Sequence, residues 1–153
     1  MLAKHFLIAI CFTLTGCASV VNDSTHPMKI ETKTAEGVLI TGADCKLSND
    51  YGTVTIKSGD TTQVRLSSKD LDIVCKHSTN HDANARALSR ANGGMWGNVI
   101  LGGGVGAIVD HNKGTAYTYP TWVQLVFGKT LVFDRSVEKE GQPVLGTEPN
   151  VSN

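Results

Sequence analysis

The fold is decided by a stretch that reads Cys45-Lys46-Leu47-Ser48-Asn49-Asp50-Tyr51-Gly52-Thr53-Val54-Thr55-Ile56-Lys57. Its second half alternates apolar and polar residues with a period of two, the pattern of a strand with one buried face. The cluster from Ser48 to Gly52 consists of residues that favour turns. The stretch therefore predicts a β-hairpin formed by residues 45–47 and 53–57.

Similar short segments lie on both sides of this hairpin. They are residues 28–32, 37–40, 63–66 and 71–75. Six short strands spaced about ten residues apart are typical of a compact antiparallel β-sandwich or half-barrel.

Two further strands are predicted nearer the C-terminus. Residues 122–127 and 130–133 are rich in β-branched and aromatic residues, with Gly128-Lys129 between them as a two-residue hairpin turn. We expect this hairpin to complete the sheet.

Length and composition limit the classes of protein to which the chain can belong. Its 153 residues leave room for one domain, and 41% hydrophobic with 18% charged residues suffice for a core. Its 14 Lys and Arg residues balance 14 Asp and Glu residues. This balance removes the electrostatic basis for nucleic-acid binding, so we expect no nucleic-acid partner.

Residues 1–16 have the layout of a secretory leader. Lys4 and His5 precede an apolar run that is too short to span a bilayer, which requires about 20 residues. The run ends in Leu14-Thr15-Gly16-Cys17, which resembles the lipobox of bacterial lipoproteins. The resemblance implies cleavage before Cys17, a diacylglycerol thioether on that cysteine and an N-acyl chain on its amino group. The alternative is an ordinary secretory signal in which Cys17 is a chance residue.

The lipoprotein resemblance also predicts where the protein resides. Two or three acyl chains suffice for stable anchoring, because a single chain binds a membrane only marginally. Ala18 and Ser19 follow the cysteine, whereas lipoproteins retained in the inner membrane usually carry an aspartate there. We therefore expect attachment to the outer membrane, facing the periplasm or exposed at the cell surface. Beyond these covalent lipids we expect no cofactor.

Two cysteines remain for the folded domain once the leader is removed and Cys17 is acylated. In the oxidising periplasm that the lipobox implies, we expect Cys45 and Cys75 to form one disulfide. The chain-entropy model assigns such a bridge about 3 to 4 kcal/mol. The alternative is a metal site made of Cys75, His77 and His81, which lacks a fourth ligand, and we expect no metal.

Residues 28–76 resemble the small β-sandwich modules of the PEGA type found in surface and envelope proteins. The likeness rests on the step from Gly42-Ala43 into a strand, the Asn49–Gly52 turn and the closing strand at 71–75. The Pro-x-Gly-Ala opening that is usual in these modules does not occur. The resemblance implies a sandwich over about a third of the chain.

A helical, glycine-rich insertion is predicted at about 80–112. Residues 80–91 are alanine-rich, with Arg86 and Arg90 one helical turn apart. Glycine costs about 1 kcal/mol relative to alanine inside a helix, so glycines four residues apart indicate close packing. The segment resembles the glycine zippers of several envelope lipoproteins, including small uncharacterised ones. The packing positions are Gly93, Gly97, Gly102 and Gly106.

Three interpretations of the glycine-rich segment remain open. It packs on the sandwich, it joins two copies of the chain, or it enters the bilayer. As a helix, residues 99–109 extend only about 16 Å, roughly half of the hydrocarbon thickness, and cannot cross alone.

The sequence contains no motif typical of an enzyme. Neither a Gly-x-Ser-x-Gly elbow nor a His-Glu-x-x-His pair occurs, and we expect a non-catalytic protein. Aromatic residues offer a candidate ligand surface for a glycan or a protein, although core packing explains them equally well. They are Trp96, Tyr117, Tyr119 and Trp122.

These features divide the chain into a leader (1–16), a tether (17–27), a β-sandwich domain (28–135) that contains the insertion, and a disordered tail (136–153). They favour a structural or assembly component of the cell envelope, anchored in the outer membrane, with a second copy or another envelope protein as its partner. A periplasmic module that binds peptidoglycan, another glycan or a protein is the first alternative. An immunity- or inhibitor-type lipoprotein is the second.

Overall fold

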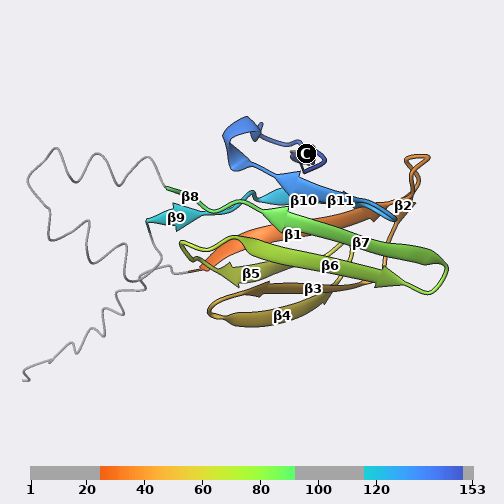
Figure 1. Cartoon of the computed structure of the whole chain (residues 1–153), viewed down its shortest axis with the longest axis horizontal. Helices are drawn as coiled ribbons and strands as arrows, with labels where there is room; N and C mark the ends of the chain where they lie inside the picture. The colour runs from red at the N-terminus through yellow and green to blue at the C-terminus, as the bar shows by residue number, and fades with distance from the viewer. Residues whose placement is uncertain (1–24, 92–115, 150–153) are drawn as a thin grey trace, which may run out of the picture.

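The computed structural model describes residues 25–91 and 116–149, which form a β domain of two sheets packed face to face (Figure 1). A small third sheet extends from one end of the domain. In chain order the elements are β1 (Thr25–Lys33), β2 (Leu39–Ile40), β3 (Asp44–Asn49), β4 (Gly52–Lys57), β5 (Thr61–Arg65), β6 (Leu71–His77), β7 (Asn80–Ala87), β8 (Arg90–Ala91), β9 (Tyr117–Thr118), β10 (Trp122–Val126), β11 (Thr130–Phe133) and the 3-10 turn η1 (Arg135–Val137).

Strand β1 is the centre of the four-stranded sheet. It pairs in parallel with β10 on one side and in antiparallel with β5 and β2 on the other. Its alternate residues Met28, Ile30 and Thr32 are buried, which confirms the strand predicted at 28–32. The buried Thr32 hydroxyl donates to the Ile40 carbonyl oxygen at 2.7 Å, so this polar group is satisfied inside the domain.

The five-stranded sheet has the order β11-β7-β6-β3-β4. Strands β3 and β4 pair in antiparallel from Asp44 and Lys57 to Asn49 and Gly52, which confirms the predicted hairpin. Cys45 and Cys75 lie directly opposite each other on β3 and β6, and both are buried. Their sulfur atoms are 2.03 Å apart, so the predicted disulfide is confirmed.

A single apolar core lies between the two sheets. Each strand supplies alternate residues to it, as a period of two requires. The largest fully buried members are Met28, Ile30, Leu47, Leu71, Ile73, Tyr119, Val123, Leu125, Phe133 and Val144. Within the described part of the chain, no helix is both long enough and apolar enough to cross a membrane.

The predicted helical insertion is wrong. Residues 80–87 form β7, residues 90–91 form β8, and residues 25–91 and 116–149 contain no α-helix. Ala83, Ala85 and Ala87 alternate toward the core, and Ala83 lies opposite Cys75. Alanine favours helices, but tertiary packing here requires small side chains on a strand beside the disulfide. The glycines at 93, 97, 102 and 106 lie outside the described residues.

The purely antiparallel arrangement is also wrong, because β10 pairs in parallel with β1 and β11 pairs in parallel with β7. The turn at Gly128-Lys129 exists, but it carries the chain from one sheet to the other and does not form a hairpin within a sheet. Gly128 has φ of +79°, a conformation that suits glycine. Both strands bury alternate residues, a pattern that is the same for a hairpin within one sheet and for a connection between two sheets. The sequence pattern therefore does not distinguish these two connections.

Residues 144–149, which we call the C-terminal strap, are ordered against the sandwich, so a disordered tail over the whole of 136–153 is wrong. Val144 is buried, and its N–H donates to the Trp122 carbonyl oxygen of β10 at 2.8 Å. Thr147 exchanges two backbone hydrogen bonds with Val132 of β11, at 2.7 and 2.9 Å. The strap therefore lies along one edge of each sheet. At the other terminus, β1 begins at Thr25, inside the segment predicted as tether.

Candidate functional site

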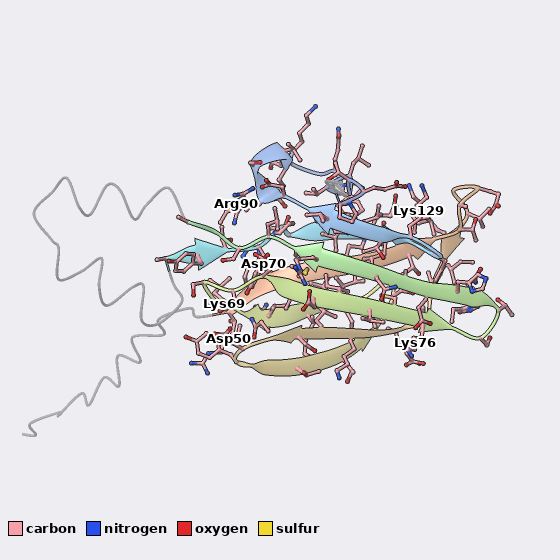
Figure 2. All side chains as sticks on the ribbon, in the orientation of Figure 1. Asp50, Lys69, Asp70, Lys76, Arg90 and Lys129 are labelled. Carbon is pink, nitrogen blue, oxygen red and sulfur yellow. A yellow bond between two sulfur atoms is a disulfide. The ribbon has the colours of Figure 1, made fainter. Side chains whose placement is uncertain are left out.

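The beginning of β1 and the short strands β8 and β9 lie together at one end of the domain, at the left of Figure 1. We call this end the Thr25 end. Figure 2 shows Asp50, Lys69, Asp70 and Arg90 there, whereas Lys76 and Lys129 lie toward the opposite end.

The flanks of residues 92–115 are paired with each other. Strands β8 and β9 form a two-stranded antiparallel sheet in which Arg90 faces Thr118 and Ala91 faces Tyr117. The two ends of the glycine-rich sequence are therefore held side by side in a short stem. Arg135 of η1 donates to the Thr118 hydroxyl and pairs with Glu138 at 3.2 Å, which links the stem to the turn after β11.

Tyr119 anchors the stem to the sandwich. Its side chain is completely buried, so the prediction that it contributes to a ligand surface is wrong. Its hydroxyl donates to the Lys69 carbonyl oxygen at 2.6 Å and accepts from the Asn49 side-chain amide at 3.2 Å. Burial raises the pKa of Tyr119 above its ordinary value, so the neutral phenol is favoured. One side chain thus joins the stem to two loops.

The loop between β5 and β6 is fixed by serine and aspartate side chains. The Ser67 hydroxyl donates to Asp50 and accepts from the Lys69 N–H at 3.0 Å. Ser89 donates its hydroxyl to the Ser67 carbonyl oxygen at 2.6 Å and its N–H to Asp70 at 2.9 Å. These bonds give the polar groups of the loop partners within the domain and hold the loop beside the residues that precede β8.

Asp134 connects β8 with η1. Two guanidinium nitrogens of Arg90 bind its two carboxylate oxygens, the bidentate geometry that favours arginine over lysine. The same carboxylate accepts from the Ser136 N–H at 2.9 Å and caps η1. Hydrogen bonding to Arg90 holds the pKa of Asp134 well below its ordinary value. The ionised carboxylate is thus tied to both elements.

His26 is half-buried on the core-facing side of β1 at this end. Its Nε2 atom has no hydrogen-bond partner among the described residues. Burial lowers the pKa of His26 below its ordinary 6.5, nearby Arg135 lowers it further, and Glu138 opposes both. The neutral imidazole is therefore the form that the folded domain favours.

The predicted aromatic surface does not form as one patch in the described part of the chain. Trp122 is half-buried on β10, and the ammonium group of Lys29 lies 4.3 Å from its ring centroid. Lys29 also pairs with Glu31 at 2.8 Å. Tyr117 lies in the stem, Tyr119 is in the core, and Trp96 lies outside the described residues.

The metal site considered for Cys75, His77 and His81 loses its thiolate, because the Cys75 sulfur is in the disulfide. His77 is instead within hydrogen-bond distance of Thr79 and Asn80, both at 3.1 Å. Among residues 25–91 and 116–149, no three His, Cys, Asp or Glu side chains are grouped so as to hold a metal.

A groove of about 190 Å³ opens beside the Thr25 end, on the side of the domain that carries β4 and β5. Leu47, Val54, Val64 and Leu71 supply its apolar lining. Its polar lining includes Arg65, whose guanidinium carbon lies 4.3 Å from the centroid of the Tyr51 ring. The C-terminal strap occupies the edges of β10 and β11 and leaves this side uncovered.

Sequence reasoning missed most of this arrangement. The pairing of Arg90 with Asp134 joins residues 44 positions apart, and no local sequence pattern predicts it. Two weaker signals were present. Asp134 stands two residues before Ser136, the spacing of a side-chain cap, and Val144 and Leu145 form an apolar pair in a mostly polar tail.

In comparisons with known proteins, no protein family, no curated protein and no solved structure was found to match the chain.

Proposed function

We propose that the protein is a lipid-anchored, non-catalytic component of the bacterial outer membrane, attached through acylated Cys17, and that its role is structural. The observation that carries this proposal is the short distance along the chain between the lipidation site and the fold. Seven residues, 18–24, separate Cys17 from Thr25, where β1 begins. At about 3.5 Å per residue, these eight steps reach at most about 28 Å.

This length limits how far Thr25 can lie from the membrane. Because Thr25 must stay within the reach of the tether, we infer that the Thr25 end faces the membrane. The stem formed by β8 and β9 lies at the same end, so both flanks of the glycine-rich residues 92–115 are directed to the membrane surface. The sequence of that segment is rich in glycine and large apolar residues.

The disulfide supports export. Disulfides form and persist in oxidising compartments such as the periplasm and are rare in the cytosol. Cys45 and Cys75 are fully buried and opposite each other in the middle of a sheet, so the bond belongs to the folded core. This agrees with the compartment to which a lipobox directs a chain.

The polar groups at the Thr25 end support a structural role. The side chains of Asn49, Ser67, Ser89, Asp134 and Tyr119 bind one another or the backbone. They hold the stem in a fixed position relative to both sheets. We infer that this end presents residues 92–115 to a second copy of the chain or to an envelope protein.

Acylation is tested by metabolic labelling of the full chain in a Gram-negative host with an alkynyl fatty acid. We expect Cys17→Ser to lose the label and to retain residues 1–16. Cys11→Ser is the matched control, because Cys11 leaves with the leader and its loss should preserve the label. An unlabelled wild-type chain, or one with an intact leader in mass spectrometry, would contradict the proposal.

The same labelled protein shows in which of the two membranes the chain resides. In a density gradient we expect the wild-type chain in the outer-membrane fraction and Ala18→Asp in the inner-membrane fraction. The aspartate supplies the retention signal that the wild-type sequence lacks. A wild-type chain that sediments with the inner membrane would remove the outer-membrane assignment while leaving the lipid anchor intact.

A further inference from the structure

The sheet edges are covered on one side of the sandwich and uncovered on the other. On one side the C-terminal strap pairs with the edges of both sheets, through Val144 on β10 and Thr147 on β11. On the other side β4 is the last strand of its sheet, with only β3 as a neighbour among residues 25–91 and 116–149. An uncovered edge strand offers unpaired N–H and C=O groups to another strand.

The register shows which groups of β4 are available. The N–H of Ser58 donates to the Ala43 carbonyl oxygen at 2.8 Å, just beyond the pair formed by Asp44 and Lys57. Antiparallel pairs alternate between residues that exchange backbone hydrogen bonds and residues that do not. Counting from that bond, Thr53, Thr55 and Lys57 direct their backbone N–H and C=O groups away from β3. The Lys57 carbonyl oxygen already accepts from the Asp60 N–H at 3.2 Å, so the free groups are those of Thr53 and Thr55 and the Lys57 N–H.

The side chains of β4 also suit a further strand. Thr53 and Thr55 are exposed on the outer face, whereas Val54 and Ile56 are only partly buried where they pack against the core. Val54 lines the groove of about 190 Å³ that opens between β4 and β5. The apolar inner face therefore stops at an open edge and is left incompletely covered.

The neighbouring edge of β5 is less available. The Arg65 carbonyl oxygen already accepts the Asn49 side-chain amide at 2.8 Å. The Arg65 guanidinium lies over the Tyr51 ring. This charged side chain, already in contact with an aromatic ring, stands at the end of β5 and hinders pairing with another strand there. Strand β4, with unpaired outward backbone groups at Thr53 and Thr55, is therefore the more accessible of these two edges in the described chain.

We propose that two copies of the chain associate by antiparallel pairing of β4 with β4, centred on Thr55, so that the five-stranded sheets form one continuous sheet. The strand is self-complementary in this register. Thr55 faces Thr55 across the twofold axis, and Lys57 faces Thr53, so no like charges stand opposite each other. On the inner face Val54 meets Ile56 of the partner, which covers both partly buried side chains.

Charge and composition agree with association. The middle of β4, Thr53-Val54-Thr55-Ile56, carries no charge and no proline, the two features with which proteins usually protect an edge. Its one charge, Lys57, pairs with Asp44 of the same chain. The chain as a whole has a formal net charge of zero, so two copies do not repel each other. The proposal does not depend on the lipid anchor.

The pairing is tested by cross-linking the full chain in intact cells with a short bis-maleimide. Side chains directly opposite in an antiparallel pair have Cβ atoms about 5.5 Å apart, so we expect Thr55→Cys to give a covalent dimer. Thr130→Cys is the matched control, an exposed threonine at the opposite edge of the same sheet. A Thr55→Cys chain that dimerises no more than Thr130→Cys, because residues 92–115 or another protein occupy the edge, would overturn the proposal.

The register has its own test. Under mild oxidation we expect the double variant Thr53→Cys with Lys57→Cys to form intermolecular disulfides and neither single variant to do so. Dimers of equal yield from Thr53→Cys alone would exclude the antiparallel register.

A third test measures the strength of association. In the chain purified in detergent, Thr55→Lys should weaken dimerisation about fivefold by light scattering, and Thr130→Lys should not. An unchanged mass for Thr55→Lys, with its melting curve intact, would also contradict the proposal.

Discussion

Tyr119 shows how one buried side chain determines the shape of one end of the domain. Its ring fills the core between the sheets, and its hydroxyl binds the Lys69 carbonyl oxygen and the Asn49 amide from two separate loops. A tyrosine is suited to this position because its body is apolar and its tip can satisfy buried polar groups. The stem formed by β8 and β9, which immediately precedes Tyr119, is positioned through this contact.

We expect Tyr119→Phe to lower the free energy of unfolding by about 1–2 kcal/mol, because the Lys69 carbonyl oxygen and the Asn49 amide, both in partly buried hydrogen bonds, lose a partner. Thermal or urea unfolding of the two chains measures the difference. The matched control is Tyr51→Phe, which keeps an exposed ring beneath Arg65 and should leave stability unchanged. Equal stability of Tyr119→Phe and wild type would mean that the hydroxyl contributes nothing.

His26 makes stability depend on pH near neutrality. Burial holds its pKa in the folded domain below the ordinary 6.5, so below that pH the unfolded chain binds a proton more readily than the folded one. Protonation therefore favours unfolding, and we expect the free energy of unfolding to fall as the pH decreases from 7 to 5.5. His26→Gln should reduce this slope, whereas His81→Gln, at an exposed position, should preserve it. Parallel slopes for wild type and His26→Gln in urea titrations would refute the assignment.

At the scale of elements, the C-terminal strap closes one side of the sandwich. It pairs with β10 and then with β11, and Val144 enters the core between them. Gly146 permits this close approach, since a Cβ atom there would lie 2.8 Å from Leu131 and 2.9 Å from Phe133. The two parallel strands at the ends of their sheets are thereby protected from pairing with other chains.

We expect Val144→Ala to lower the free energy of unfolding by about 2 kcal/mol, because it removes two buried carbon atoms and leaves a space. The neighbouring Leu145 is 71% exposed, so Leu145→Ala is a matched control that should have almost no effect. Chemical unfolding of both variants gives the comparison. If the two substitutions cost the same, the strap does not contribute to the core.

The elements that the sequence predicts well are those with strict alternation and local partners. The hairpin of β3 and β4 is such a case, since β-branched residues and a turn cluster specify it within thirteen positions. Strand β7 was missed because its core positions are alanines, which have high helix propensity and give little hydrophobic contrast. The burial of these alanines opposite Cys75, Ile73 and Leu71 of β6 depends on tertiary packing, which the local sequence does not encode.

At the scale of the whole molecule, the sequence predicted a mainly β domain with one disulfide but not its topology. Parallel pairing of β1 with β10 joins residues such as Glu31 and Gln124, which are 93 positions apart. No periodicity within a strand encodes which distant strand becomes its neighbour. The polar cluster at the Thr25 end has the same origin, because Asn49, Lys69 and Tyr119 come together only after both sheets have formed.

The long-range pairing of β1 has a consequence for the order in which the domain folds. Strands β3, β4, β6 and β7 pair with one another across shorter stretches of sequence, such as the 30 residues between Cys45 and Cys75, so we expect them to assemble and to be oxidised early. The other sheet cannot be completed until β10 has been synthesised, since β1 is its central strand and β10 is β1's parallel neighbour. We therefore expect the disulfide to form before the sheet built around β1 is complete.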